Sequence, residues 1–358
     1  MSEDYTGLRK GRHERRPWDG PMASWLKPLP SGYFALVMAT GIIAVACDQQ
    51  SLRFPAQVLY VVACVAYLAL ATLLGLRIAW FPRQVLAELT HHATGFTFLT
   101  TVAATNVLGA ASAVVHGWWG LASVLWWISL PLFLVGVYVP LIAFILRRDK
   151  PGLSAGINGT WFLLAVAVES VAVLAALRLG HRPQDLLAFV ALAAFGLGFV
   201  LYLVVMTMVF LRWTFHRLDP EEVHPPAWIA PGAAAITTLA GSTLLASAPQ
   251  VERLDRLAPF LEGVTILAWA TATFWFPIML ALGAWRHIAC RVPLAYDFSL
   301  WAMVFPLGMY AAATFDLLEV EQVPHLDSIP KVALALAAAA WLATMAGLVR
   351  RLLKGAQA

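Results

Sequence analysis

The chain consists of long apolar stretches separated by short polar segments that carry most of its charged residues. Ten of these stretches are long enough to cross a bilayer, because about 20 residues of α-helix span the hydrocarbon. The pattern therefore predicts an all-α polytopic membrane protein with ten transmembrane helices. Their expected limits are 31–47, 56–80, 94–115, 119–146, 159–178, 184–213, 227–247, 261–285, 297–317 and 331–349.

Two kinds of apolar stretch alternate along the chain. The even-numbered stretches are longer and rich in Leu, Val and Trp, a composition that can face lipid. The odd-numbered stretches are shorter and rich in Gly, Ala, Thr, Ser and Pro. This alternation is typical of a weak internal repeat and indicates five helical hairpins.

The polar segments predict the orientation. Eighteen of the 24 Lys and Arg residues fall on the side of the N-terminal tail. Because basic residues accumulate in cytoplasmic loops, both termini are expected in the cytoplasm. We expect a cytoplasmic tail at 1–30, a ten-helix domain at 31–352 and a short cytoplasmic tail at 353–358. The location expected is the plasma membrane, which is the inner membrane in a bacterium.

Composition narrows the possible functions. Hydrophobic residues make up 61% of the chain and charged residues 12%, about half the charged fraction of soluble domains. The three cysteines, Cys47, Cys64 and Cys290, show no metal-binding spacing. We expect no enzyme activity, no cofactor, no metal and no nucleic-acid partner. A membrane enzyme or receptor would need clustered catalytic or ligating residues at one depth, which the sequence does not offer.

Small and hydroxyl residues recur on one face of several odd-numbered stretches. Either the inner helices pack closely there, with Thr side chains bonded to their own helix, or the face lines a shared water-accessible lumen. The residues alone leave both interpretations open. The faces are Gly32, Ala35 and Ala39; Thr94, Thr97, Thr101, Thr105 and Ser112; Ala165, Glu169, Ala172 and Ala176; and Ala230, Ala234, Thr237 and Gly241.

The ninth stretch places one bulky aromatic side chain among small residues. Ala302, Gly308 and Ala312 lie at helical spacing around Phe305, and Pro306 follows it directly. Pro306 removes a backbone donor and is expected to kink the helix. Phe305 is therefore either a plug in a narrow conduit or an ordinary packing side chain on a small-residue face.

Two motifs resemble a known family. SGYFALVMATGIIAVA and, above all, SLWAMVFPLGMYAAATF resemble the tellurite-resistance/dicarboxylate transporter family, over Pro30–Leu352. That family includes bacterial tellurite-resistance proteins, yeast malic acid transporters, fungal sulfite efflux pumps and plant slow-type anion channels. The resemblance implies five hairpins in quasi-five-fold order around a central pore, with odd helices inside and even helices outside. It also implies a homotrimer in the lipid bilayer.

The resemblance assigns roles to individual residues. Phe305 matches the phenylalanine that occludes the pore of the channel members, and Pro231 matches the family's seventh-helix proline. The implied function is transport of a small anion: a C4-dicarboxylate, a tellurite- or sulfite-like anion, or a monovalent anion. The expected pore-lining residues are Ala302, Pro306, Gly308, Ala35, Ala39, Thr101, Thr105, Glu169, Pro231 and Thr237.

Selectivity is expected to arise without a fixed cation, because no Lys or Arg lies in the middle of a predicted span. Hydroxyls such as Thr101, Thr105 and Thr237 and backbone groups at the prolines would contact the ion. Weakly hydrated anions should then pass more easily.

Glu169 is the one ionisable residue deep in a predicted span. With no cation nearby, we predict that it is protonated near neutral pH. It then serves as the proton site of a proton-coupled dicarboxylate symporter, the alternative function, or as a structural hydrogen-bond donor.

Overall fold

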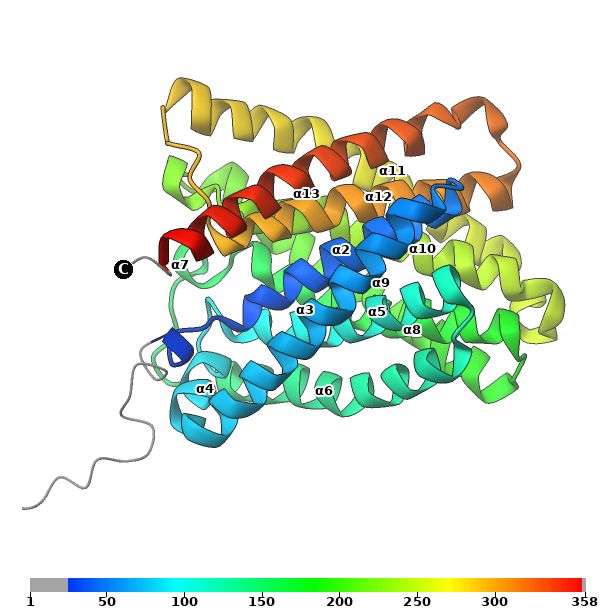
Figure 1. Cartoon of the computed structure of the whole chain (residues 1–358), viewed down its shortest axis with the longest axis horizontal. Helices are drawn as coiled ribbons and strands as arrows, with labels where there is room; N and C mark the ends of the chain where they lie inside the picture. The colour runs from blue at the N-terminus through cyan, green and yellow to red at the C-terminus, as the bar shows by residue number, and fades with distance from the viewer. Residues whose placement is uncertain (1–24, 356–358) are drawn as a thin grey trace, which may run out of the picture.

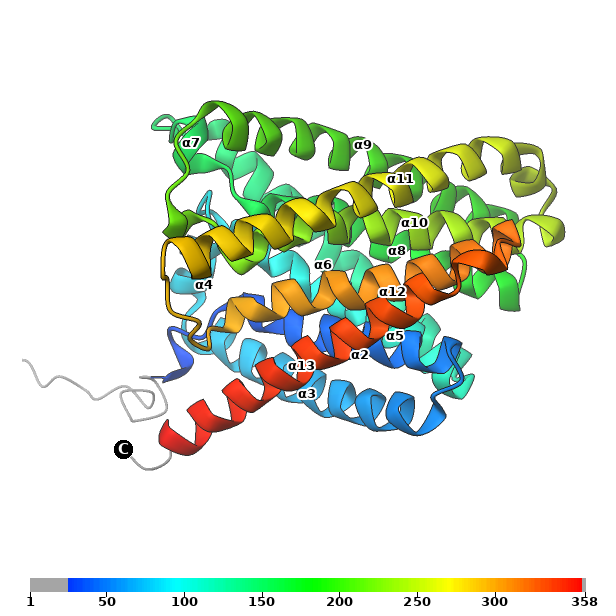
Figure 2. The ribbon, with the colours of Figure 1, turned by 90° about the horizontal axis from the view of Figure 1, so that it is seen from above.

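A computed structural model describes residues 25–355, so the first 24 residues of the predicted N-terminal tail lie outside the described residues. Within 25–355 there are ten helices long and apolar enough to span a membrane and no β-strand, which confirms the all-α prediction. The helices run side by side along the long axis of the molecule (Figures 1 and 2). They are α2 (Phe34–Gln49), α3 (Arg53–Trp80), α5 (Leu99–His116), α6 (Trp119–Leu146), α8 (Leu163–His181), α9 (Asp185–Phe215), α10 (Ile229–Ser247), α11 (Glu252–Ala284), α12 (Trp301–Glu321) and α13 (Ser328–Gly355).

Burial separates inner helices from outer helices. The apolar windows of α2, α5, α8 and α10 are 89% buried and that of α12 is 67% buried. The corresponding windows of α3, α6, α9, α11 and α13 are between 11% and 33% buried. The small-residue stretches therefore form the core, and the stretches rich in Leu, Val and Trp form the surface that lipid can cover.

The inner helices contact one another in a closed sequence: α2 with α5, α5 with α8, α8 with α10, α10 with α12, and α12 with α2. Each outer helix packs against the inner helix that precedes it in the chain and against the next one in this sequence. This order is the one that an arrangement of five hairpins requires. The quasi-five-fold relation between the hairpins stays a prediction.

Aromatic side chains of outer helices form hydrogen bonds with the inner helix of the following hairpin. Polar groups inside a bilayer need partners within the protein, and hydrogen bonds between helices supply them. Four outer helices donate in this way: Tyr67 of α3 to Thr105 (2.9 Å), Trp126 of α6 to the Val171 carbonyl (3.2 Å), Trp269 of α11 to Thr314 (3.1 Å) and Trp341 of α13 to Thr40 (2.9 Å).

Each inner helix begins with a 3₁₀ turn. Because the chain crosses the bundle between successive inner helices, all five begin at the same end of the molecule, where residues 25 and 355 also lie (Figure 1). Five helix N-termini therefore converge at that end. The turns are η1 (Ser31–Tyr33), η2 (Gly95–Phe98), η3 (Gly159–Phe162), η5 (Pro225–Trp228) and η8 (Phe298–Leu300).

Arginines at the ends of outer helices fix the segments that follow. Arg212 in the last turn of α9 donates to the Ser154 carbonyl (2.9 Å) and pairs with Glu222. Arg77 near the end of α3 pairs in the same way with Glu88 of the short helix α4 (Pro82–Leu89). The segment between α9 and α10 is thus bound to the end of α9.

Candidate functional site

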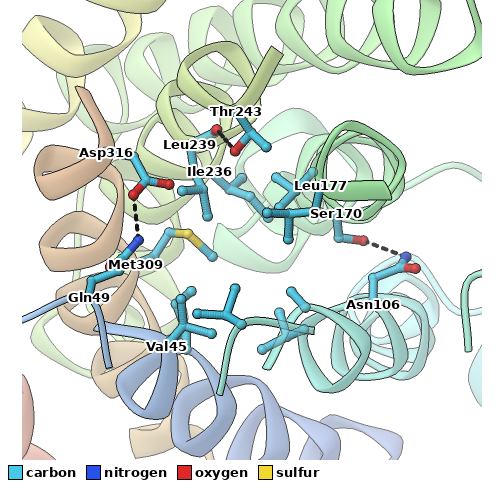
Figure 3. A pocket seen from close by; sticks show the side chains of 15 residues that line it. Val45, Gln49, Asn106, Ser170, Leu177, Ile236, Leu239, Thr243, Met309 and Asp316 are labelled. Carbon is cyan, nitrogen blue, oxygen red and sulfur yellow. Dashed lines mark hydrogen bonds between the residues drawn. The ribbon is translucent and has the colours of Figure 1, made fainter. Parts of the chain in front are cut away.

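Two small cavities lie between the five inner helices, and every one of these helices contributes to both. The C-side cavity has a volume of about 30 Å³ and lies toward the C-terminal halves of the inner helices (Figure 3). The residues lining it are Ile42, Val45 and Gln49 of α2; Asn106, Val107, Ala110 and Val114 of α5; Ser170, Val173 and Leu177 of α8; Ile236, Leu239 and Thr243 of α10; and Met309 and Asp316 of α12.

The N-side cavity, about 40 Å³, lies at the N-terminal ends of the same helices. It is lined by Gly32, Ala35 and Met38; Thr97 and Thr100; Thr160 and Leu163; Pro226 and Ile229; and Phe298, Ser299, Ala302 and Phe305. Each cavity thus collects side chains from segments far apart in the sequence, as a passage along the centre of the bundle would.

Apolar side chains separate the two cavities. Phe305 is the deepest residue of α12 that lines the N-side cavity, and Met309, one turn later, lines the C-side cavity. Both are 1% exposed. A cavity must exceed about 10–15 Å³ to hold one water molecule, so each space fits a few waters. The two cavities are therefore small and separate in this structure.

The polar groups of the C-side cavity are uncharged amides and hydroxyls, apart from one carboxyl. Asn106 donates from Nδ2 to the Ser170 hydroxyl (3.0 Å), and Ser170 donates to the Ala167 carbonyl (2.7 Å). The Oδ1 of Asn106 is buried and has no hydrogen-bond partner among the described residues. None of the described residues that line either cavity is Lys or Arg.

Asp316 and Gln49 are polar residues of the C-side cavity that the sequence prediction did not include. Gln49 Nε2 donates to Asp316 Oδ1 at 2.6 Å, joining the ends of α2 and α12 beside the C-side cavity (Figure 3). Asp316 lies seven residues beyond Met309, two helical turns along the same face. Its spacing of eleven residues from Phe305, about three helical turns, places it on the same face and is the sequence signal for it.

The predicted pore-lining residues divide into two groups. Ala35, Ala302 and Phe305 do line the N-side cavity. The other eight line neither cavity: Ala39, Thr101, Thr105, Glu169, Pro231, Thr237, Pro306 and Gly308. In their places the adjoining positions, such as Met38, Ile236 and Met309, face the cavities.

Gly308 and Pro306 lie at contacts between helices. A Cβ atom on Gly308 would come within 2.8 Å of Ile43 Cγ1 on α2. A Cβ atom on Gly232 of α10 would come within 2.7 Å of Pro306 Cγ. Small residues at these positions let the backbones of α12, α2 and α10 approach closely, as in other membrane helix pairs.

The threonine hydroxyls are used within their own helices. Thr101 donates to the Phe98 carbonyl and Thr105 to the Thr101 carbonyl, both at 2.7 Å. Thr105 also accepts from Tyr67 of the outer helix α3. The close-packing interpretation of these faces therefore describes this structure better than the lumen interpretation.

Glu169 lies between α8, α9 and α10. Its side chain is fully buried, and its Oε1 is 3.0 Å from the Thr237 hydroxyl. The carboxyl group packs directly against Gly198 of the outer helix α9, and Oε2 has no hydrogen-bond partner among the described residues. This placement differs from the prediction that Glu169 faces a pore.

The comparison with known families identifies the class. The family described as voltage-dependent anion channel matches residues 28–349, and the chain belongs to that family. The resemblance predicted from the two motifs is thereby confirmed. The protein is an integral membrane transporter or channel for anions and not an enzyme.

Individual relatives agree with this class. A sulfite efflux pump of Trichophyton rubrum is 24% identical over 323 residues, which cover 83% of each chain. An uncharacterized transporter of Methanocaldococcus jannaschii is 24% identical over 302 residues, covering 82% of this chain and 86% of the relative. An uncharacterized membrane protein of Mycobacterium tuberculosis is 34% identical over 154 residues, covering 42% of this chain and 77% of the relative.

Proposed function

We propose that small monovalent anions cross the membrane between the five inner helices, through the N-side cavity and then the C-side cavity. The observation that carries this proposal is that all five inner helices line both cavities. A pocket that served only packing between two neighbouring helices would be lined by those two alone.

The direction of the inner helices favours anions at the N-side cavity. The N-terminus of a helix carries a partial positive charge and unpaired backbone N–H groups. Five such ends surround this cavity. Their combined field raises the local concentration of anions without a charged side chain, and anions bound only by partial charges can leave again.

The absence of Lys and Arg from the described cavity linings favours monovalent ions. The cost of moving an ion from water into a medium of low dielectric grows with the square of its charge. A C4-dicarboxylate or another divalent oxyanion would therefore pass chiefly in its singly charged form. Hydrogensulfite fits this requirement, and fungal relatives are named sulfite efflux pumps.

Phe305 is proposed as the gate, together with Met309. Both are buried between the two cavities, and an apolar constriction excludes ions by excluding the water that hydrates them. Opening requires the Phe305 side chain to leave this position.

Proton coupling through Glu169 is the alternative. The carboxyl group that lines a cavity is that of Asp316, so coupling to the transported anion would run through Asp316 more directly than through Glu169. A symporter of this kind would accumulate its anion when a proton gradient is the only driving force.

The assembly is proposed to be a homotrimer with one passage per protomer and both termini in the cytoplasm. The described ends of the chain lie at one end of the bundle (Figure 1), and 18 of 24 basic residues are predicted on that side.

Flux into proteoliposomes tests the proposal. Purified protein should carry chloride, nitrate and sulfite, with nitrate faster than chloride because it is more weakly hydrated, and should carry sulfate and succinate slowly. Sulfite flux should rise as pH falls and the singly charged form increases. Equal rates for sulfate and nitrate would contradict passage through an uncharged apolar constriction. Uphill uptake driven by a pH gradient alone would favour symport.

A further inference from the structure

A groove separate from the anion passage lies beside the last helix. It has a volume of about 620 Å³ and is formed by α13, the start of α12 and residues 294–296. The red end of α13 and the beginning of α12 lie next to each other at the end of the bundle that holds both described chain ends (Figures 1 and 2). Because α13 is an outer helix, the groove lies on the outer surface of the bundle.

Three cations stand at the end of this groove. Arg350, Arg351 and Lys354 line it from the last turns of α13. Among the described residues, none of the three has an ion-pair or hydrogen-bond partner. The lining contains no carboxylate to offset their charge.

A neutral hydrogen-bond donor lies close to these cations. The Tyr296 ring packs on Gly347, where a Cβ atom would come within 2.7 Å of ring carbon Cδ2. The Tyr296 hydroxyl is buried beside the Trp301 side chain, and among the described residues no acceptor takes its proton. Burial raises the pKa of Tyr296, so the phenol stays protonated and able to donate. A buried hydroxyl whose proton has no acceptor costs free energy, which a bound acceptor would recover.

The deeper part of the groove is apolar. Leu300 of η8, Met303 of α12, and Ala340 and Ala343 of α13 line it within the membrane-spanning region. The groove thus combines three cations and a hydroxyl at the predicted cytoplasmic surface with an apolar channel that leads toward the bilayer centre. A free inorganic anion would contact only the cations and the hydroxyl and would leave the apolar channel empty.

We propose that this groove binds an anionic phospholipid of the cytoplasmic leaflet. The phosphate lies against Arg350, Arg351 and Lys354 and accepts from the Tyr296 hydroxyl, while an acyl chain occupies the apolar part between α12 and α13. Charge complementarity selects this occupant, because cytoplasmic leaflets carry anionic lipids and each basic residue near them adds about five-fold in affinity.

Native mass spectrometry of the purified full-length protein tests this site. With phosphatidylglycerol and phosphatidylcholine supplied at equal concentrations, the wild type should retain phosphatidylglycerol at least about ten-fold better. R350Q/R351Q/K354Q should lose that preference. R147Q/R148Q/K150Q, which removes three cations after α6 at the same end of the protein, should keep it.

A second variant separates the groove from general surface charge. A343W keeps every cation and fills the apolar part, so it should also reduce retention of phosphatidylglycerol about ten-fold. Folding is checked by the melting temperature in zwitterionic detergent, where all variants should match the wild type within a few degrees.

Four results would overturn the proposal. Equal losses in the two triple variants would mean unspecific attraction to charge. Unchanged binding by A343W would mean that no chain enters the groove. If inorganic phosphate at the same concentration displaced the bound lipid completely, the site would be a site for free anions. A change of oligomer mass in A343W alone would mean that the groove is a contact between copies of the chain.

Discussion

Glu169 and Gly198 face each other across the contact between α8 and α9, where a Cβ atom on Gly198 would lie 2.6 Å from the Glu169 carboxyl carbon. The absence of a side chain at Gly198 is therefore what makes room for a buried carboxyl between an inner helix and an outer helix. The Thr237 hydroxyl, which also contacts the Ala233 carbonyl at 3.0 Å, bounds the same space from α10.

Gly198→Ala should destabilise the protein. The added methyl group forces Glu169 to move inside a packed contact, and overpacking of this kind costs about 1–3 kcal/mol. Gly196→Ala is the matched control in the same helix, since no atom lies within 4 Å of a Cβ built there. Gly196→Ala should leave the melting temperature unchanged or raise it slightly, because Ala favours helix over Gly by about 1 kcal/mol. Equal changes of melting temperature in the two variants would argue against a close contact between Gly198 and Glu169.

Glu169→Gln should leave anion flux and its pH profile close to those of the wild type. Gln fits the same space and can donate to Thr237, and the position lies outside both cavities. The measurement is sulfite and nitrate flux into proteoliposomes between mildly acidic and mildly alkaline pH. A mutant that keeps flux but loses its pH dependence would restore Glu169 as a proton site.

Asp316→Asn should increase nitrate flux roughly two- to ten-fold at neutral pH, since an ionised carboxyl in the C-side cavity opposes the passage of an anion. The ratio of mutant to wild-type flux should fall toward one as pH is lowered and the wild-type carboxyl takes up a proton. Glu319→Gln is the control, because Glu319 is an exposed acid on the same helix. Similar gains in both variants would point to a surface-charge effect.

Arg212→Gln should lower stability by about 1–3 kcal/mol, because it removes a buried guanidinium that pairs with the half-exposed Glu222 and donates to the Ser154 and Arg217 carbonyls. The comparison is Arg217→Gln, whose pair with Asp219 is exposed and should contribute less than about 1 kcal/mol. Thermal unfolding in detergent measures both. Equal losses of stability in the two variants would mean that the burial of Arg212 makes no difference to the contribution of its ion pair.

The sequence predicts the fold well because membrane insertion leaves few alternatives. Span lengths follow from the hydrocarbon thickness, and the contrast between stretches rich in small residues and stretches rich in Leu and Val separates inner helices from outer helices. The largest boundary difference is in α11, which starts at Glu252 and not at 261. Its first turn carries charged residues, which hydropathy assigns to a loop although the helix continues beyond the apolar region.

The predicted cavity faces are displaced by about one residue on most inner helices. Thr237 and Gly308 are predicted to line a pore, but Ile236 and Met309 line the C-side cavity. The physical reason is that inner helices are buried on every side, so small residues mark where backbones touch, and medium-sized apolar side chains fill the centre. Sequence periodicity reveals the stripe but not which of several buried faces it occupies.

The exchange Phe305→Ala tests the central claim most directly, with chloride and nitrate flux measured in proteoliposomes at matched protein density. Phe315→Ala is the control, because Phe315 has the same size, lies in the same helix and lines neither cavity. If Phe305 closes the passage between the cavities, its removal should raise flux about ten-fold, which corresponds to about 1.4 kcal/mol less barrier. Phe315→Ala should leave flux within about two-fold of the wild type. Unchanged flux in a correctly folded Phe305→Ala protein would contradict passage through the centre of the inner helices past this side chain.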